Sequence, residues 1–161
     1  MVLLQSDINA IESFLKRRSK KKSGMTESDL LNAWLWEKHR ENLQWRRVRL
    51  GVLPTKELNR MYLTILRWAD AIVIKDGIVF IVEAKLRAQP GVISQLQLYD
   101  KLFGQTPEFS QYWLWPRKLM ILSSVVDLNM VELASDKGIL FELFTEEEVN
   151  ITRKAQMLPV I

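Results

Sequence analysis

Two apolar segments separated by Asp76-Gly77 constrain this chain more than any other feature. The first covers residues 71–74 and the second residues 78–82, and both are rich in β-branched side chains. Asp-Gly is strongly preferred in the two-residue turns that connect antiparallel strands. The pattern therefore predicts a β-hairpin over residues 67–85.

Three charged residues interrupt or end these strands, and they are Asp70, Glu83 and Lys85. Because alternate side chains of a strand face the same side, Glu83 and Lys85 point the same way. A turn at residues 76–77 also brings Asp70 close to Glu83. Two neighbouring carboxylates repel each other unless a cation lies between them, and Mg²⁺ prefers such oxygen ligands. The hairpin therefore predicts a divalent cation site beside a lysine that orients water or stabilises developing negative charge.

The same residues also have purely structural explanations. Asp70 could pair with Arg67 or with Lys85, which would remove the cost of burying its charge. Glu83 and Lys85 could simply form the exposed face of an edge strand. Each of these explanations is sufficient for one residue, whereas a shared site explains all of them together.

Composition limits the classes of protein to consider. The chain has 161 residues, 48% of them hydrophobic, which suits a globular domain with a sizeable core. It has no cysteine, which excludes disulfides and thiolate zinc sites and fits a cytoplasmic setting. No apolar run reaches the ~18–20 residues that span a bilayer, so no membrane partner is expected. The net charge of +4 favours a polyanionic partner.

The N-terminal part, residues 1–24, is expected to be a short helix over residues 5–18 followed by a basic arm. Lysine and arginine fill most of positions 16–22, including Lys20, Lys21 and Lys22. This run is either a solvated linker or an arm that contacts nucleic acid, because basic residues near phosphates release counterions. Residues 25–161 are expected to form the main domain.

A second helix is predicted from Thr26 to about Leu43. Thr26 and Asp29 form a capping-box pattern at its start. Glu27 falls on the same stripe as Leu30, Leu31 and Trp34, which predicts a role in a site. Its first-turn position is also explained by the helix dipole. His39, the single histidine, is predicted to be a packing or surface residue.

The remaining pattern predicts alternating strands and helices. Residues 44–53 form a strand whose arginines mark either a sheet edge or a face turned towards phosphates. Residues 58–66 fit a helix or an extended segment, and the aromatic residues of 109–116 are expected in the core or an interface. The other expected elements are a helix over 92–103 ending at Gly104, strands over 118–124 and 139–144, and helices over 127–137 and from 145 onwards. This order implies an α/β fold with a mixed central sheet flanked by helices.

Asp70 followed by Glu83-Ala84-Lys85 resembles the core motif of the PD-(D/E)XK nuclease superfamily. Gln95 and Tyr99 match the Gln-x-x-x-Tyr motif of its RecB-like branch, and Glu27 stands where many members carry a glutamate. The resemblance covers about residues 25–125 and implies a restriction-endonuclease-like αβββαβ core. Ala69 replaces the proline of the superfamily motif, but the two acids and the lysine are intact.

The resemblance implies a Mg²⁺-dependent deoxyribonuclease that hydrolyses phosphodiester bonds. Asp70, Glu83, the carbonyl of Ala84 and Glu27 would hold one or two Mg²⁺ or Mn²⁺ ions. Lys85 would position the attacking water or stabilise the transition state, with Gln95 and Tyr99 in support. The expected phosphate contacts are Lys20, Lys21, Lys22, Arg46, Arg47 and Arg49.

An alternative belongs to a different class of function. The chain could be a non-catalytic protein with a nuclease fold that binds DNA or forms a structural part of a phage or mobile-element assembly. RNA as a substrate, and exonuclease as well as endonuclease action, stay open at this point. A homodimer is the expectation if both strands of a duplex are cut, because two sites achieve this most simply.

Overall fold

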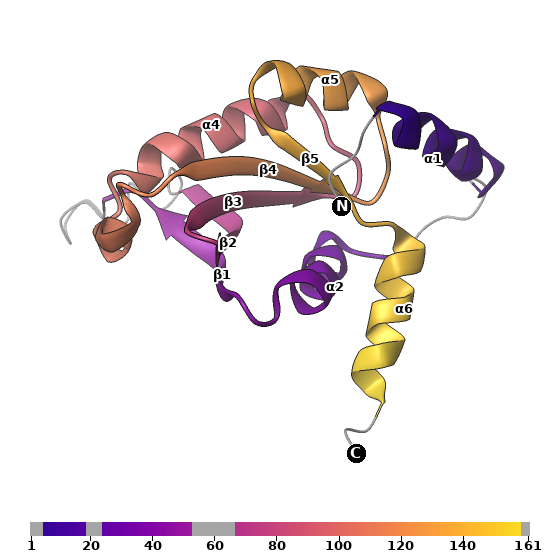
Figure 1. Ribbon diagram of the computed structural model, residues 1–161, viewed down its shortest axis with the longest axis horizontal. Helices are drawn as coiled ribbons and strands as arrows, with labels where there is room; N and C mark the ends of the chain where they lie inside the picture. The colour runs from indigo at the N-terminus through magenta and orange to yellow at the C-terminus, as the bar shows by residue number, and fades with distance from the viewer. Residues whose placement is uncertain (1–4, 19–23, 53–66, 159–161) are drawn as a thin grey trace.

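A five-stranded sheet runs through the centre of the protein (Figure 1). The computed structural model describes residues 5–18, 24–52 and 67–158. The strands are β1 (Leu43–Leu50), β2 (Arg67–Lys75), β3 (Ile78–Lys85), β4 (Arg117–Ser123) and β5 (Leu140–Leu143). The helices are α1 (Gln5–Arg18), α2 (Glu27–His39), α4 (Gly91–Phe103), the short 3₁₀ helix η1 (Pro107–Tyr112), α5 (Leu128–Asp136) and α6 (Glu146–Met157).

The strands lie in the order β1-β2-β3-β4-β5. The first three strands pair antiparallel, whereas β3, β4 and β5 pair parallel. Parallel neighbours need a crossover connection, which α4 supplies between β3 and β4 and α5 supplies between β4 and β5. The predicted α/β fold with a mixed central sheet is therefore confirmed.

Helices cover both faces of the sheet (Figure 1). One buried cluster packs α4 and α5 against one face and includes Leu96, Tyr99 and Phe103. A second cluster packs α2 and α6 against the other face and includes Trp34 and Val149. The candidate site lies at one end of the β2–β3 hairpin, between the layers that contain α2 and α4.

The predicted hairpin is present, and its turn has the expected chemistry. Asp76 has φ 52° and Gly77 has φ 74°, so both central residues adopt the left-handed conformation. Turns of this kind match the right-handed twist of the two strands, and asparagine, aspartate and glycine tolerate them best. Lys75 and Ile78 form the last pair before the turn, which fixes the register of β2 against β3.

Helix α2 begins as predicted but ends earlier. The amide of Asp29 donates to Oγ1 of Thr26 at 3.1 Å, and the amide of Thr26 donates to Oδ2 of Asp29 at 3.0 Å, so the capping box is complete. The helix ends at His39, because the chain turns there and Leu43 already begins β1. His39 is buried and packs edge-on against Trp34 with ring centres 4.5 Å apart, as expected of a packing residue.

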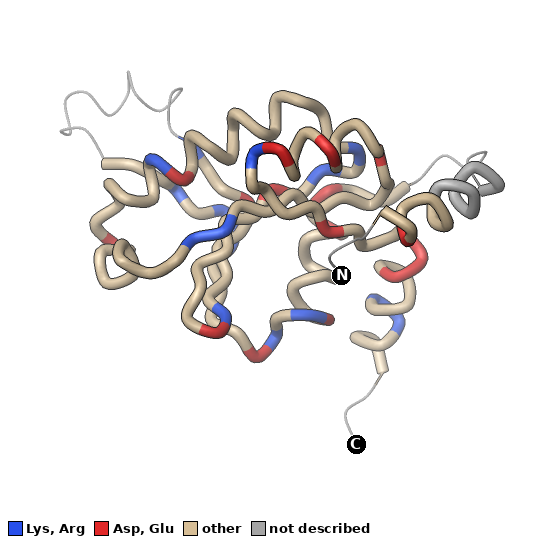
Figure 2. Tube along the Cα trace, turned by 45° about the horizontal axis from the view of Figure 1, so that its top comes forward, with Lys and Arg blue, Asp and Glu red and all other residues tan. Residues whose placement is uncertain are grey.

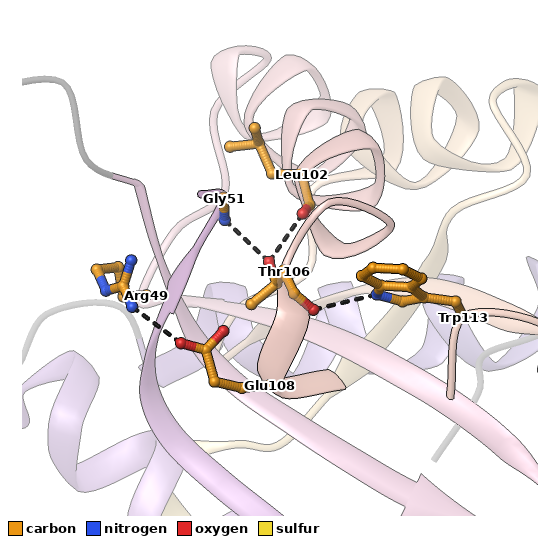
Figure 3. Close-up of polar contacts among 6 residues, drawn as sticks. All are labelled: Arg49, Gly51, Leu102, Thr106, Glu108 and Trp113. Atoms are coloured by element: carbon orange, nitrogen blue, oxygen red, sulfur yellow. Dashed lines mark hydrogen bonds and ion pairs between the residues drawn. The ribbon is translucent and has the colours of Figure 1, made fainter. Parts of the chain in front are cut away.

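Strand β1 ends at Leu50, which is three residues earlier than the predicted strand. Gly51 follows with φ 103°, a conformation that other residues rarely adopt. Its amide donates to Oγ1 of Thr106 at 2.9 Å, and the same hydroxyl donates to the carbonyl of Leu102 at 2.8 Å (Figure 3). The end of β1 is thereby tied to the segment that follows α4.

The aromatic segment is only partly in the core. Phe109 and Tyr112 are buried and pack against Trp45 of β1. Trp113 donates its indole N–H to the carbonyl of Thr106 (Figure 3), but Trp113 and Trp115 stay partly exposed. The intervening Leu114 is 98% exposed. The first two aromatic residues lie in the core as expected, whereas the two tryptophans lie outside it, and their place in an interface stays a prediction.

Charge is interspersed along the described chain, with acidic and basic residues close together at several places (Figure 2). The positive net charge therefore does not by itself identify a binding surface. None of the helices in the described part of the chain is long and apolar enough to cross a membrane. The predicted basic residues Lys20, Lys21 and Lys22 and the ambiguous segment 58–66 lie outside the described residues.

Candidate active site

The carboxylates of Asp70 and Glu83 meet at the open end of the β2–β3 hairpin, opposite the turn. Regular pairing of these strands ends at Ala71 and Val82. Immediately beyond that pair, Oδ2 of Asp70 accepts the amide N–H of Ala84 at 2.8 Å, so a side chain replaces the backbone of β2 as the acceptor. This bond fixes the Asp70 carboxylate against β3, where it lies close enough to Glu83 for the two charges to interact.

Glu83 is a buried carboxyl in an unfavourable environment. Its side chain is only 4% exposed. Burial, followed by the negative charge of Asp70, raises the pKa of Glu83 to about 8. Burial likewise raises the pKa of Asp70, partly offset by the hydrogen bond from Ala84 and the charge of Lys85. Oε2 of Glu83 has no hydrogen-bond partner among the described residues, which is a costly state for a buried oxygen.

Lys85 lies on the same side of β3 as Glu83, as the strand alternation predicts. Its Nζ is 3.7 Å from Oε1 of Glu83 and 3.9 Å from Oε2 of Glu27. The lysine is about one-third exposed, so its ammonium group can reach both the buried carboxylates and a molecule outside.

Glu27 reaches this end of the hairpin from the first turn of α2, but it is not buried. Its side chain is 49% exposed, so the expectation that it lies on the buried stripe of the helix is wrong. Met25 before the helix and Leu30 in its first turn are buried in the core, whereas Glu27 lies on the exposed side of that turn. Glu27 contacts Lys85 in the structure. A role of Glu27 in binding a metal stays a prediction.

Gln95 and Tyr99 meet on α4, as their spacing predicts. Nε2 of Gln95 donates to the hydroxyl of Tyr99 at 2.7 Å. Burial, followed by the charge of Glu83, raises the pKa of Tyr99 to about 12, and its hydroxyl contacts the Glu83 carboxylate. The tyrosine therefore stays protonated near neutral pH and links α4 to the carboxylate pair.

The donor set suits a hard divalent cation. Asp70 and Glu83 supply two close carboxylates, and the unpartnered Oε2 of Glu83 gives a cation an oxygen to bind. Among the described residues, no group of three or more His, Cys, Asp or Glu side chains could hold a metal ion. Mg²⁺ is commonly bound by one or two carboxylates together with water and substrate phosphates, so a pair is sufficient.

The three arginines of β1 lie on the edge strand next to β2 and differ in their contacts. Arg46 bonds to Asn32 of α2, and Arg49 forms an ion pair with Glu108 at 3.2 Å (Figure 3). Arg47 is exposed. Local sequence patterns do not predict Asn32 or Glu108 as partners, because they lie 14 and 59 residues away from the arginines they bind.

No family model matches this sequence, and no curated protein matches it. Among solved structures, the chain is similar to a repair endonuclease from Pyrococcus abyssi, with a TM-score of 0.50, 16% identity, and coverage of 78% of this chain and 49% of that chain. The chain thus spans about half the length of that endonuclease. It is also similar to AF1548, a protein of unknown function, with a TM-score of 0.48, 13% identity, and coverage of 84% and 71%.

The likeness to the repair endonuclease concerns the fold. Both chains share a mixed sheet with flanking helices, so this protein has a restriction-endonuclease-like fold. The carboxylates, the lysine and the tyrosine described above lie at one place on that fold. Their chemistry has to be argued from this chain's own residues.

The burial of Glu83 predicts an unusual pH dependence of stability. In EDTA, we expect the free energy of unfolding to fall between pH 4.5 and about 8, because the folded protein retains a proton that the unfolded chain has released. The loss should be on the order of a few kcal/mol. Glu83→Gln should remove this slope and raise the melting temperature at pH 8. Urea unfolding at several pH values checks both expectations, and an unchanged slope in Glu83→Gln would contradict them.

Proposed function

We propose that this protein is a metal-dependent nuclease that hydrolyses phosphodiester bonds in DNA. The observation that carries the proposal is the pair of buried Glu83 and half-buried Asp70 with Lys85 beside it, on a nuclease-like fold. A buried carboxyl with a pKa of about 8 destabilises the folded protein when it ionises. Such strongly shifted groups are concentrated at functional sites, where a ligand compensates for their cost.

Asp70 and Glu83 would hold Mg²⁺ or Mn²⁺, with the carbonyl of Ala84 as a further oxygen ligand. The cation would neutralise charge on the scissile phosphate and lower the pKa of a bound water. The bond from the Ala84 amide keeps Asp70 in one orientation, so its second oxygen stays available.

Lys85 would act on the phosphate and on the attacking water. Its ammonium lies beside Glu83 and is partly exposed, so it can donate to a developing negative charge at the mouth of the site. Glu27, which lies 3.9 Å from the ammonium, would keep the lysine side chain directed to this place. Gln95 and Tyr99 would fix the Glu83 carboxylate from the opposite side.

The decisive experiment is a cleavage assay with four forms of DNA and one RNA as substrates. Single-stranded, linear duplex, circular and four-way DNA, together with a single-stranded RNA, are incubated with Mg²⁺, Mn²⁺ or EDTA. We expect cleavage of at least one DNA form with either metal and none in EDTA. Absence of metal-dependent cleavage on every DNA form would refute the proposed function, and cleavage of RNA alone would refute the DNA substrate.

Titration calorimetry with Mn²⁺ separates a metal site from an inert fold. We expect the wild-type protein to release or absorb heat as it binds Mn²⁺, and we expect Asp70→Asn to lose most of this binding heat. A protein that neither binds Mn²⁺ nor cleaves would instead fit a non-catalytic role for the same fold.

A further inference from the structure

An open groove of about 310 Å³ runs along the edge strand β1, where η1 and the segment before it face the strand. Its lining residues are Trp45, Arg46, Arg47, Val48, Arg49, Thr106, Glu108 and Phe109. Three arginines and only one acidic residue line the groove, so its positive charge suits an anion. Thr106 and Glu108 form one wall of the groove. The hydrogen bond of Thr106 with Gly51 and the ion pair of Glu108 with Arg49 hold this wall against β1 (Figure 3).

The structure distinguishes among the three arginines. Arg46 is held by Asn32, and Arg49 is held by Glu108. The Nη1 atom of Arg49 is also buried and has no hydrogen-bond partner among the described residues, so a ligand in the groove does not reach it without movement. Within the same described ranges, the guanidinium of Arg47 makes no hydrogen bond or ion pair. Arg47 is thus the arginine that is free to bind.

Arg47 also has an uncommon backbone conformation. Its φ is 48°, in the left-handed region that residues other than glycine, asparagine and aspartate seldom occupy. Trp45 and Val48 are three positions apart, yet both pack into the cluster on the α4 side of the sheet. The left-handed conformation of Arg47 interrupts the alternation of side chains along β1, so Trp45 and Val48 face the same side. Backbone strain of this kind is concentrated at functional sites.

The position of Arg47 connects the groove to the candidate active site. Arg46 pairs with Ala71 and Val48 pairs with Ala69, so Arg47 lies opposite Asp70 across the two strands. Neighbouring strands are about 4.8 Å apart. The backbone that carries the free arginine is therefore one strand away from the backbone that carries a site carboxylate.

We propose that Arg47 binds a phosphate group of the substrate's nucleic-acid backbone, in the groove along β1. This inference rests on the proposed function, because it identifies where the strand lies next to the site that would cut it. A polyanion suits the arginine-rich lining, and the strand register puts Arg47 one strand away from Asp70. Phosphate contacts of this kind position a strand without reading its sequence.

The test measures binding apart from cleavage. Fluorescence anisotropy with a short labelled DNA strand is recorded in EDTA at several salt concentrations, in an Asp70→Asn background. We expect Arg47→Gln to weaken binding about threefold to tenfold at moderate salt and to lower the slope of log Kd against log salt by about one. Lys75→Gln, which removes one positive charge at an exposed position outside the groove, is the matched control, and its salt slope should stay unchanged.

A second substitution separates lost contact from lost structure. Arg47→Gly removes the guanidinium but suits a positive φ, so its melting temperature should be equal to or higher than that of the parent. Its DNA affinity should fall as much as that of Arg47→Gln. Equal losses in Arg47→Gln and Lys75→Gln, or no loss in Arg47→Gln, would overturn the proposal.

Competition identifies the class of ligand. Unlabelled DNA should displace the probe, and polyglutamate of similar charge should not. If polyglutamate competes equally well, the groove is a general polyanion or peptide site and the proposal is wrong. Wild type that binds DNA through Arg47 but cuts nothing with Mn²⁺ would refute the nuclease function and leave this inference intact.

Discussion

Replacing Asp70 by asparagine should reduce metal-dependent DNA cleavage by on the order of a thousandfold or more. The amide oxygen of asparagine can still accept the N–H of Ala84, so the local backbone contact is kept. The substitution removes the negative charge that would bind a cation and that also opposes ionisation of Glu83. We therefore expect the metal-free variant to be at least as stable as wild type, and cleavage rates together with thermal melting check both parts.

The same hairpin offers a matched control at its other end. Asp76 lies in the turn, is exposed, and has a left-handed φ that asparagine accepts readily. Asp76→Asn should keep full cleavage and an unchanged melting temperature. Equal activity of Asp70→Asn and Asp76→Asn would show that the carboxylate pair is not the catalytic site.

Replacing Lys85 by methionine should lower cleavage by about a hundredfold to a thousandfold. Methionine keeps the apolar length of the side chain but removes the ammonium that lies 3.7 Å from Glu83. Because that positive charge lowers the pKa values of Asp70 and Glu83, its loss should also shift the pH dependence of cleavage to higher pH. A pH–rate profile measures this shift, which a purely structural lysine would not produce.

Lys75→Met is the control for the lysine. Lys75 ends β2 beside the turn and is exposed, so its loss should change cleavage less than threefold. Lys85→Arg should recover part of the activity, since it restores charge at a different reach. A Lys85→Met variant with wild-type rates and an unshifted profile would exclude the proposed role.

Local signals predicted the elements that form the site. The Asp76-Gly77 turn fixed which residues pair in the hairpin, and strand alternation then placed Glu83 and Lys85 on one side. The capping box marked the start of α2, and the i, i+4 spacing joined Gln95 to Tyr99. Each of these contacts joins residues that are only a few positions apart or are separated by one tight turn. Local sequence patterns are therefore sufficient to predict them.

Other features depend on residues far apart in the chain. Helix α2 and strand β1 both end earlier than the local pattern predicts, and Glu27 is exposed rather than on a buried face. Burial of a first-turn residue depends on which element packs against it, and Glu27 is exposed although Met25 before it and Leu30 after it are buried. The different states of Arg46, Arg47 and Arg49 likewise depend on Asn32 and Glu108, which approach β1 only in the folded protein.

The sequence by itself therefore determined the hairpin, the order of strands and helices, and the meeting of two acids and a lysine at the hairpin's open end. Only the tertiary structure decided how strongly these charged groups are desolvated and how far their pKa values are shifted. Burial by the layers on both sides of the sheet raises the pKa of Glu83 to about 8 and leaves one of its oxygens without a partner in the described chain. Desolvation is a property of the packed interior, since it depends on every group that displaces water from the carboxylate.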